Sequence, residues 1–296
     1  MPRPRSLTES RSPSRSPFAL RMGGLLIASV GAGGSLAAVI LLAQPAALAA
    51  AHGSASPGAS PSPAPTVTVT VTPSPSPSPP TAVGFKGTPA VGALFFGKLG
   101  HLCTAAVVDS PHGNLAITAA HCIQGLRLGS HSSVFFAPGY HDGKFPYGKW
   151  IVRSAFVDVN WKRHQDANDD FAFLVVGRAG QRIQKRTGGE KVVTDVTLPQ
   201  AAEVIGYPSA TKRPVKCDAP AKRLHKKGYR QMVFDCGGFT NGTSGGPFLM
   251  HVSRKTGRGE VFGVIGGYQQ GGDTPSISYS AMFERNVARL FKRASA

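Results

Sequence analysis

The sequence predicts an all-β body, and three observations support that prediction. From Ala90 onward, short apolar runs alternate with Gly, Pro, Asn and Asp, a pattern typical of many short strands joined by turns. A polar stretch at residues 178–190 divides these runs into two sets of about six. Only the last segment, near residues 283–293, places apolar residues at helical spacing. We therefore expect two β units followed by one helix.

The first 50 residues have the layout of a secretory signal peptide. An arginine-rich lead precedes an apolar run at residues 22–42, then Pro45, and small residues suited to cleavage stand at 47–50. The run is about 20 residues long, which also approaches the length of a membrane span, so an uncleaved membrane anchor is the alternative. Both interpretations place the body of the protein outside the cell.

Residues 51–83 are expected to form a linker. They consist almost entirely of Ser, Pro, Ala, Thr, Gly and Val, and repeated Ser-Pro pairs favour a stiff, extended backbone with nothing to bury. Thr and Val alternate at residues 66–72 as they would in a strand, but the proline-rich flanks favour a spacer.

The chain after the signal segment is strongly basic. Of 33 Lys and Arg and 15 acidic residues, five arginines and one glutamate precede residue 22, which leaves 28 against 14, a net charge of +14. A field of this sign favours association with anionic surfaces such as acidic cell-wall polymers. No nucleic-acid-binding motif accompanies the charge, so we expect no nucleic-acid partner.

The individual elements follow from the apolar runs. The first set of strands is expected at residues 91–96, 102–108, 115–118, 134–137, 150–159 and 171–176. The second set is expected at residues 191–196, 202–207, 214–217, 230–236, 246–250, 261–266 and 276–280. In the last segment, Phe283, Val287, Leu290 and Phe291 share one helical face, and Arg285, Arg289, Lys292 and Arg293 lie mostly off it.

A serine between glycines is the first candidate functional group. Ser244 lies in the stretch NGTSGGP at residues 241–247. Gly242 permits a turn whose N–H points inward, and Gly245 leaves room for a substrate chain beside the hydroxyl. Alone, a Gly-x-Ser-x-Gly pattern is weak, since it also occurs in plain turns and in the strand-to-helix elbow of α/β-hydrolases.

Two upstream segments add a base and a carboxylate. TAAHC ends in His121-Cys122, and DDFAFL contains Asp170. Together with Ser244 they give the chain order His, Asp, Ser, whereas α/β-hydrolases run Ser, Asp, His and subtilisins Asp, His, Ser. An α/β-hydrolase esterase would also need a later histidine, and His251 follows the serine too closely for that fold.

Over residues 90–293 the sequence resembles the trypsin/chymotrypsin-like serine peptidases, particularly their short bacterial secreted members. The resemblance implies an all-β fold of two six-stranded antiparallel β-barrels with a C-terminal helix, and an active site between the barrels. It also sets the domain boundaries that we expect: 1–50 signal peptide or membrane anchor, 51–83 linker, 84–185 first barrel with His121 and Asp170, and 186–296 second barrel with Ser244 and the helix.

The resemblance implies a role for each residue of the set. Ser244 would be the nucleophile, His121 the general base and acid, and Asp170 the carboxylate that orients the histidine. Asp170 fits the family pattern because it is followed by Phe171-Ala172, whereas Asp169 is followed by another aspartate. The backbone N–H groups of Gly242 and Ser244 would form the oxyanion hole. Such a serine endopeptidase needs no metal or organic cofactor.

Four cysteines in an exported chain favour disulfides, and three pairings are possible. The resemblance implies the sequential pairing, Cys103–Cys122 and Cys217–Cys236, in which the first bridge ties the histidine loop to a neighbouring strand. A metal site made of Cys103, His121 and Cys122 is the rival interpretation, but no Cys-x-x-Cys pair supports it.

The substrate pocket is expected around Gly238, Phe239, Gly266 and Gly267. The family position at the base of the pocket is Gly238 rather than Asp, which disfavours cleavage after Lys or Arg. No histidine stands near Gly266, as it would in glutamyl-specific members. The expected partner is a polypeptide substrate, and we expect a monomer.

Two further expectations concern activity itself. A catalytically silent, exported binding or adhesion module on the same fold is the alternative to a peptidase. In animal-type zymogens a new N-terminus pairs with an aspartate just before the nucleophilic serine, but this chain has Thr243 there. A buried ammonium would find no carboxylate at that position. We therefore expect the oxyanion loop to be ordered by its own contacts and activity not to depend on one particular free N-terminus.

Overall fold

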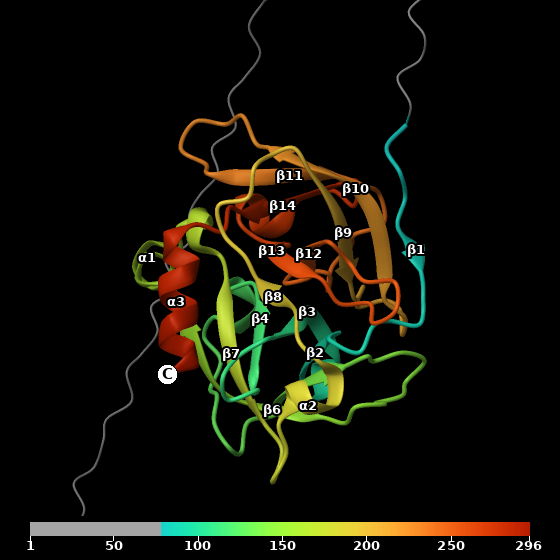
Figure 1. Cartoon of the computed structure of the whole chain (residues 1–296), viewed down its shortest axis with the longest axis vertical. Coiled ribbons are helices and arrows are strands. Elements are labelled where there is room, and N and C mark those ends of the chain that lie inside the picture. The colour runs from blue at the N-terminus through green and yellow to red at the C-terminus, as the bar shows by residue number, and fades with distance from the viewer. Residues whose placement is uncertain (1–77) are drawn as a thin grey trace, which may run out of the picture. The chain divides into compact units, whose positions relative to one another are not determined.

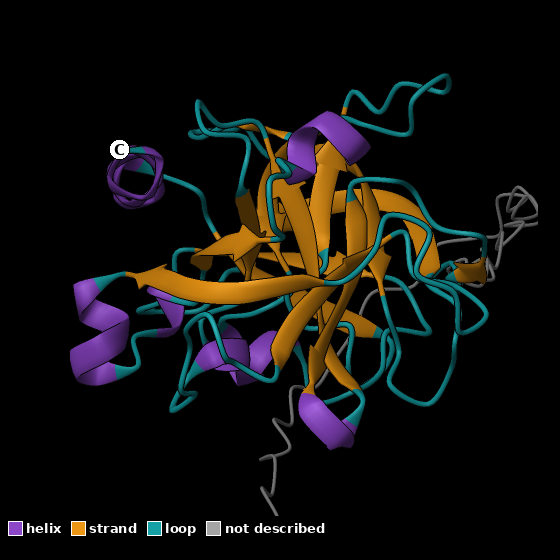
Figure 2. Cartoon of the chain, turned by 90° about the horizontal axis from the view of Figure 1, so that it is seen from below, coloured by secondary structure: helices purple, strands orange, loops and turns teal. Residues whose placement is uncertain are grey.

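A computed structural model describes residues 78–296, and strands dominate this part of the chain (Figures 1 and 2). The expected signal peptide or anchor and all but the last residues of the expected linker lie outside the described residues. Helices occupy the periphery, while strands fill the centre of the body (Figure 2). None of the described helices is long and apolar enough to cross a membrane.

The first half of the body is a closed barrel with the strand order β2-β3-β4-β7-β6-β5. Its strands are β2 (Val91–Phe96), β3 (His101–Val108), β4 (Leu115–Thr118), β5 (Val134–Pro138), β6 (Trp150–Val157) and β7 (Ala172–Gly177). Phe136, Trp150 and Leu174 are fully buried in its interior. Burying each such side chain contributes about 1.5–3 kcal/mol, so this interior stabilises the barrel whose rim carries the candidate loops.

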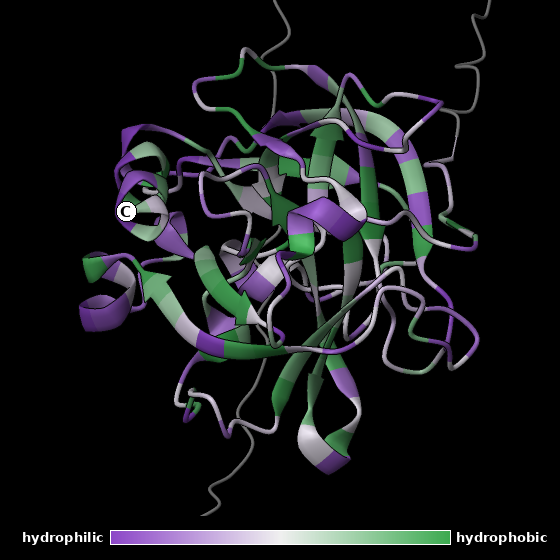
Figure 3. Ribbon diagram, turned by 60° about the horizontal axis from the view of Figure 1, so that its bottom comes forward, coloured by the Kyte–Doolittle hydropathy of each residue, from purple (hydrophilic) through white to green (hydrophobic). Residues whose placement is uncertain are grey.

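The second half is a curled antiparallel sheet with the order β14-β11-β10-β9-β12-β13, to which β8 adds in parallel. Its strands are β8 (Lys191–Val192), β9 (Gln200–Gly206), β10 (Val215–Arg223), β11 (Gln231–Asp235), β12 (Pro247–Met250), β13 (Glu260–Val264) and β14 (Ile277–Ala281). Phe234, Phe248 and Phe262 form its core, with neighbouring rings packed edge to face. Hydrophobic residues accordingly follow the strands, and polar residues the loops (Figure 3).

A separate apolar cluster joins the two halves. It includes Ile117 and Phe173 from the barrel and Ile205 and Leu249 from the curled sheet, all of them fully buried. Helix α3 (Arg285–Ser295) extends this cluster through Val287 and Leu290, and it lies beside β7 in Figure 1. The two halves, whose loops carry the candidate residues, are therefore packed together by a shared apolar cluster.

The expected all-β architecture is confirmed, and a strand is present at every predicted position. Most bounds shift by one or two residues, but the strand predicted at 214–217 runs on to Arg223 as β10, and the one predicted at 191–196 is reduced to the two residues of β8. The predicted run at residues 150–159 stops earlier, because Asp158 accepts a hydrogen bond from the Asn160 N–H and so caps helix α1 (Val159–His164). The predicted C-terminal helix is also confirmed, whereas α2 (Ile183–Thr187) lies in the polar stretch where no element was expected.

The chain enters the body along the curled sheet rather than the barrel. Strand β1 (Val83–Gly84) pairs with β10, and Thr81 forms a bridge with Gly237. The Ala82 N–H donates to Gly237 O at 2.8 Å, and the Gly237 N–H donates to Pro80 O at 2.8 Å. Residues 80–84 therefore belong to the folded body, and they support the segment that leads to Phe239.

Candidate active site

His121 lies at the rim of the barrel, three residues after the end of β4. The intervening residues Ala119 and Ala120 are fully buried, because neighbouring segments approach the chain closely at this point. His121 opens a short 3-10 turn, and 12% of its side chain is exposed. Cys122 is bonded to Cys103 of β3, so a covalent link fixes the residue next to the histidine.

Asp170 is completely buried just before β7, and three nitrogen atoms face its carboxylate. The His121 backbone N–H donates to Oδ1 at 2.9 Å, and the His121 ring nitrogen Nδ1 lies 2.8 Å from Oδ2. The Gly267 N–H donates to Oδ2 at 2.7 Å. With Nδ1 engaged in this way, the other ring nitrogen, Nε2, is available for a second partner.

The neighbouring acids lie elsewhere. Asp169 points toward the helices, where Asn286 Nδ2 and Asn160 Nδ2 donate to its two oxygens at 2.5 and 3.2 Å. Burial raises the pKa of the Asp169 carboxyl, and the two amide donors oppose that shift. Asp166 accepts from the Asn168 N–H and caps a 3-10 turn. Of the three acids, the structure therefore brings only Asp170 to His121.

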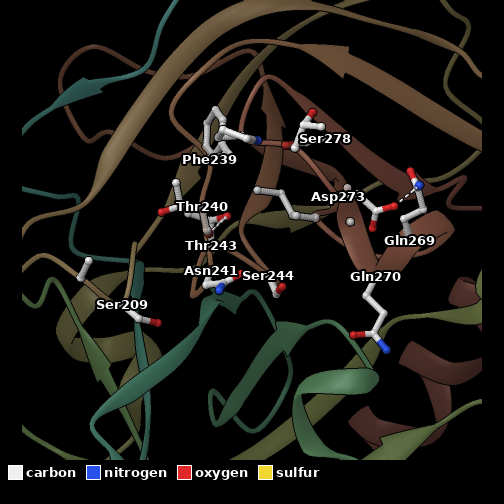
Figure 4. A pocket seen from close by; sticks show the side chains of 16 residues that line it. Ser209, Phe239, Thr240, Asn241, Thr243, Ser244, Gln269, Gln270, Asp273 and Ser278 are labelled. Atoms are coloured by element: carbon white, nitrogen blue, oxygen red, sulfur yellow. Dashed lines mark hydrogen bonds between the residues drawn. The ribbon is translucent and has the colours of Figure 1, made fainter.

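Ser244 lies in the turn that leads into β12, and it meets the histidine segment across the junction of the two halves. Cys122 Sγ is 3.7 Å from Ser244 O, and the Thr104 N–H donates to the same oxygen at 2.7 Å. The side chain of Ser244 points into a cavity (Figure 4). The fold thus places Ser244 next to the residue that follows His121, although 122 positions separate Ser244 from Cys122 in the sequence.

Gly242 has a backbone conformation that only glycine adopts easily, with φ of +97°. A Cβ at this position would lie 2.5 Å from Ser209 N and 2.6 Å from Tyr207 O, so there is also no room for a side chain. The Ser209 N–H donates to Asn241 O at 2.8 Å. Because N–H and C=O of a trans peptide point in opposite directions, the Gly242 N–H points away from Ser209.

Neither the Gly242 N–H nor the Ser244 N–H donates a hydrogen bond within residues 78–296. Thr243 between them is occupied, since its N–H and its hydroxyl both bond to Thr240 O, at 3.1 and 2.8 Å. The turn therefore keeps two closely spaced donors free beside the serine. Such a pair can stabilise a negatively charged oxygen.

The cavity beside Ser244 has a volume of about 760 Å³. Phe239 and Ile265, which are 5% and 3% exposed, form apolar parts of its wall, together with the hydroxyl-bearing Ser278. The exposed residues Gln269, Gln270 and Asp273 line its other side, across from Thr240 and Asn241 (Figure 4). Pockets of this size hold one side chain of a larger ligand or a small molecule.

Of the four residues assigned to the pocket from the sequence, Phe239 lines the cavity. Gly267 instead donates to Asp170, and a Cβ on Gly266 would lie 3.0 Å from the same carboxylate. A Cβ on Gly238 would meet Ala82 of the entering segment at 3.2 Å. Sequence reasoning missed Ser209, Ile265 and Ser278, because these residues come from separate loops and carry no motif of their own.

The pairing of the cysteines excludes the rival metal interpretation at this site. Cys103, His121 and Cys122 place potential ligand atoms within 4.8 Å of one another. The two sulfur atoms, however, are joined to each other at 1.99 Å, and Cys217 is bonded to Cys236 in the same way. A disulfide offers no thiolate to a metal ion. Both bridges follow the sequential pairing.

No protein-family model matches the sequence. A search of curated proteins also finds no relative. Solved structures, in contrast, give clear matches to the fold.

The protease Anisep from Arthrobacter nicotinovorans is 22% identical with a TM-score of 0.62, and the match covers 73% of this chain and 99% of that one. The thermostable serine protease AL20 from an extremophilic microorganism is 24% identical with a TM-score of 0.60, covering 70% and 97%. A Glu endopeptidase is 16% identical with a TM-score of 0.56, covering 74% and 97%. The described part of this chain therefore has the double-barrel fold of the chymotrypsin-like serine proteases.

Proposed function

We propose that this chain is a secreted serine endopeptidase that hydrolyses peptide bonds through His121, Asp170 and Ser244. The observation that carries the proposal is the buried Asp170 carboxylate, which is hydrogen-bonded to both the ring and the backbone of His121. The loop that carries His121 contacts the turn of Ser244, and that turn has two free N–H donors. Nucleophile, base and orienting acid in this arrangement are the requirements of acyl transfer.

In the first half of the reaction, Ser244 Oγ attacks the carbonyl carbon of the scissile peptide, and His121 Nε2 accepts the hydroxyl proton. Asp170 keeps Nδ1 protonated, so that Nε2 is the basic nitrogen, and its charge stabilises the imidazolium that forms. The negative oxygen of the tetrahedral intermediate accepts from the Gly242 and Ser244 N–H groups. Losing one such donor in a related site costs about 10²–10³ in rate.

In the second half, His121 returns the proton to the leaving amine, the C–N bond breaks, and an acyl-enzyme on Ser244 remains. Water then attacks the ester with His121 as base, and the product carboxylate leaves. The chain itself supplies every group in this cycle, so the proposed chemistry requires no cofactor. The cavity next to the cut combines the apolar Phe239 and Ile265 with residues that carry hydroxyl and amide groups, which suits a side chain with both apolar and polar parts.

Export is part of the proposal. Both disulfides are of the kind that persists in oxidising surroundings outside the cytoplasm. A secretory leader such as residues 1–50 would deliver the chain there. The strong positive charge of the body suits retention near an anionic cell wall.

The experiment is peptide-library profiling of the secreted chain, with variants as controls. The wild-type chain should cleave a subset of peptides, and Ser244→Ala should remove nearly all of that cleavage, by about 10⁶ by analogy with other triads. Ser253→Ala is the matched control, because Ser253 is an exposed serine in the loop between β12 and β13. Cleavage that survives in Ser244→Ala, or a wild-type chain that cleaves nothing, would contradict the proposal and favour the silent binding module.

A further inference from the structure

The free N–H donors of the Ser244 turn (residues 241–245) can stabilise an oxyanion only if the turn holds one conformation. Thr243 bonds back to Thr240 and closes the turn on itself, but these contacts do not fix the turn relative to the barrel that carries His121. The two halves of the proposed site come from different sheets, so their alignment needs contacts between the sheets.

Thr104 of β3 supplies such contacts. It is fully buried, and all four of its polar positions are occupied. Its N–H donates to Ser244 O at 2.7 Å, and its hydroxyl donates to Gly242 O at 3.0 Å. The same hydroxyl accepts from the Tyr207 N–H at 2.9 Å, and its carbonyl accepts from the Thr118 hydroxyl at 2.7 Å.

These four bonds tie together the parts that the reaction needs to align. The carbonyls of Gly242 and Ser244 belong to the peptide groups directly after those that carry the two oxyanion donors, so holding these carbonyls fixes the chain on one side of each donor. Tyr207 leads to Ser209, whose N–H holds Asn241 O and thereby sets the direction of the Gly242 N–H. One hydroxyl therefore links both the Ser244 turn and the segment at residues 207–209 to the barrel.

We propose that Thr104 is a positioning residue that keeps the oxyanion hole assembled in the free protein. This inference rests on the proposed function and adds to it the side chain that fixes the Ser244 turn relative to the barrel. Glycine or alanine at residue 104 would keep the backbone bond to Ser244 but would leave Gly242 O and the Tyr207 N–H buried without a partner.

The test compares Thr104→Val with Thr104→Ser in the secreted chain. Valine preserves the shape and removes the hydroxyl, whereas serine keeps the hydroxyl. We expect Thr104→Val to lower kcat at least tenfold with KM changed less than about threefold, because the missing support acts mainly on the transition state. Thr104→Ser should recover most of the loss.

Two further measurements separate positioning from general stability. A peptide aldehyde forms a hemiacetal whose oxygen occupies the oxyanion hole, whereas the matching peptide alcohol does not. Thr104→Val should weaken binding of the aldehyde at least tenfold and binding of the alcohol much less. Thr187→Val is the matched control, because the Thr187 hydroxyl is also buried but bonds to Ile183 O in helix α2 and to Gly188 O just after it. It should lower Tm without lowering kcat.

Three outcomes would overturn the inference alone: wild-type kcat in Thr104→Val, no recovery in Thr104→Ser, or equal weakening of aldehyde and alcohol. A wild-type chain that hydrolyses no peptide would instead overturn the proposed function, and this inference with it.

Discussion

Glu190 makes the stability of this protein depend on pH in an unusual direction. It lies in the segment between the two halves and is fully buried. Its N–H donates to Val107 O and its carbonyl accepts from the Asp109 N–H, at 2.8 and 2.9 Å. Oε2 accepts from the Gly259 N–H at 2.5 Å, while Oε1 has no partner among the described residues. Burial raises the pKa of this carboxyl to about 8, although the Gly259 N–H and Arg258 oppose the shift.

The sign of the effect follows from that pKa. Below pH 4.5 the carboxyl is protonated in both the folded and the unfolded chain. Between pH 4.5 and about 8 the unfolded chain releases the proton and the folded chain keeps it, so the contribution of Glu190 to stability is lost as the pH rises. At 1.36 kcal/mol per pH unit, the loss is roughly 3 kcal/mol by pH 7 and roughly 5 kcal/mol above pH 8.

Glu190→Gln should remove this dependence, since an amide does not ionise. The variant should gain unfolding free energy relative to the wild type as the pH rises, by a few kcal/mol between pH 5 and pH 9. Urea unfolding with the disulfides intact, followed by the fluorescence of the two tryptophans, measures the difference. Asp109→Asn is the control, because it removes an exposed carboxyl beside the same segment and should show no comparable trend. An equal difference at pH 5 and pH 9 would refute the reasoning.

The remaining predictions concern the site and its surroundings. Asp170→Asn should lower turnover by about 10⁴ and Asp169→Asn by far less, and the opposite order in a steady-state assay would show that the wrong aspartate is assigned. Gly242→Ala should cost about 10²–10³ in kcat, because its Cβ would displace Ser209 or the Gly242 N–H; unchanged kcat would contradict that geometry. Chains that start at Ala51 or just before Pro80 should be equally active. A chain that starts at Val83 lacks the bonds to Gly237 and should have a lower Tm, and an equal Tm for all three chains would show that these bonds contribute nothing to stability.

Much of this fold was predictable from local patterns. Most strands are short apolar runs bounded by turn residues, so their pairing partners are not needed to recognise them. The end of β10 past residue 217 is largely polar and was missed. Strand β1 was missed because it is two residues long and exists only through its pairing with β10. Helix α1 was missed because the apolar pattern of β6 continues past Val157, and the Asp158 cap ends the strand there.

The candidate site also has parts that could be predicted from the sequence and parts that could not. Ser244 and His121 stand in motifs that are continuous in sequence, and Asp170 could be distinguished from Asp169 by the residues after it. The cavity wall could not be predicted, since Ser209, Ile265 and Ser278 meet only after the curled sheet forms. The role of the Thr104 hydroxyl could not be predicted either, because its hydrogen-bond partners are 103 and 138 positions away in the sequence.

The central claim is that Ser244 is an activated nucleophile, and labelling by a fluorophosphonate probe tests it most directly. The serine oxygen attacks phosphorus and fluoride leaves, a step that needs the same base and oxyanion donors as peptide hydrolysis. The folded wild-type chain should take up one probe per molecule, located at Ser244 by mass analysis of its peptides, and His121→Ala should label far more slowly. A folded chain that takes up no probe, or one in which Ser244→Ala labels as fast as the wild type, would contradict the account.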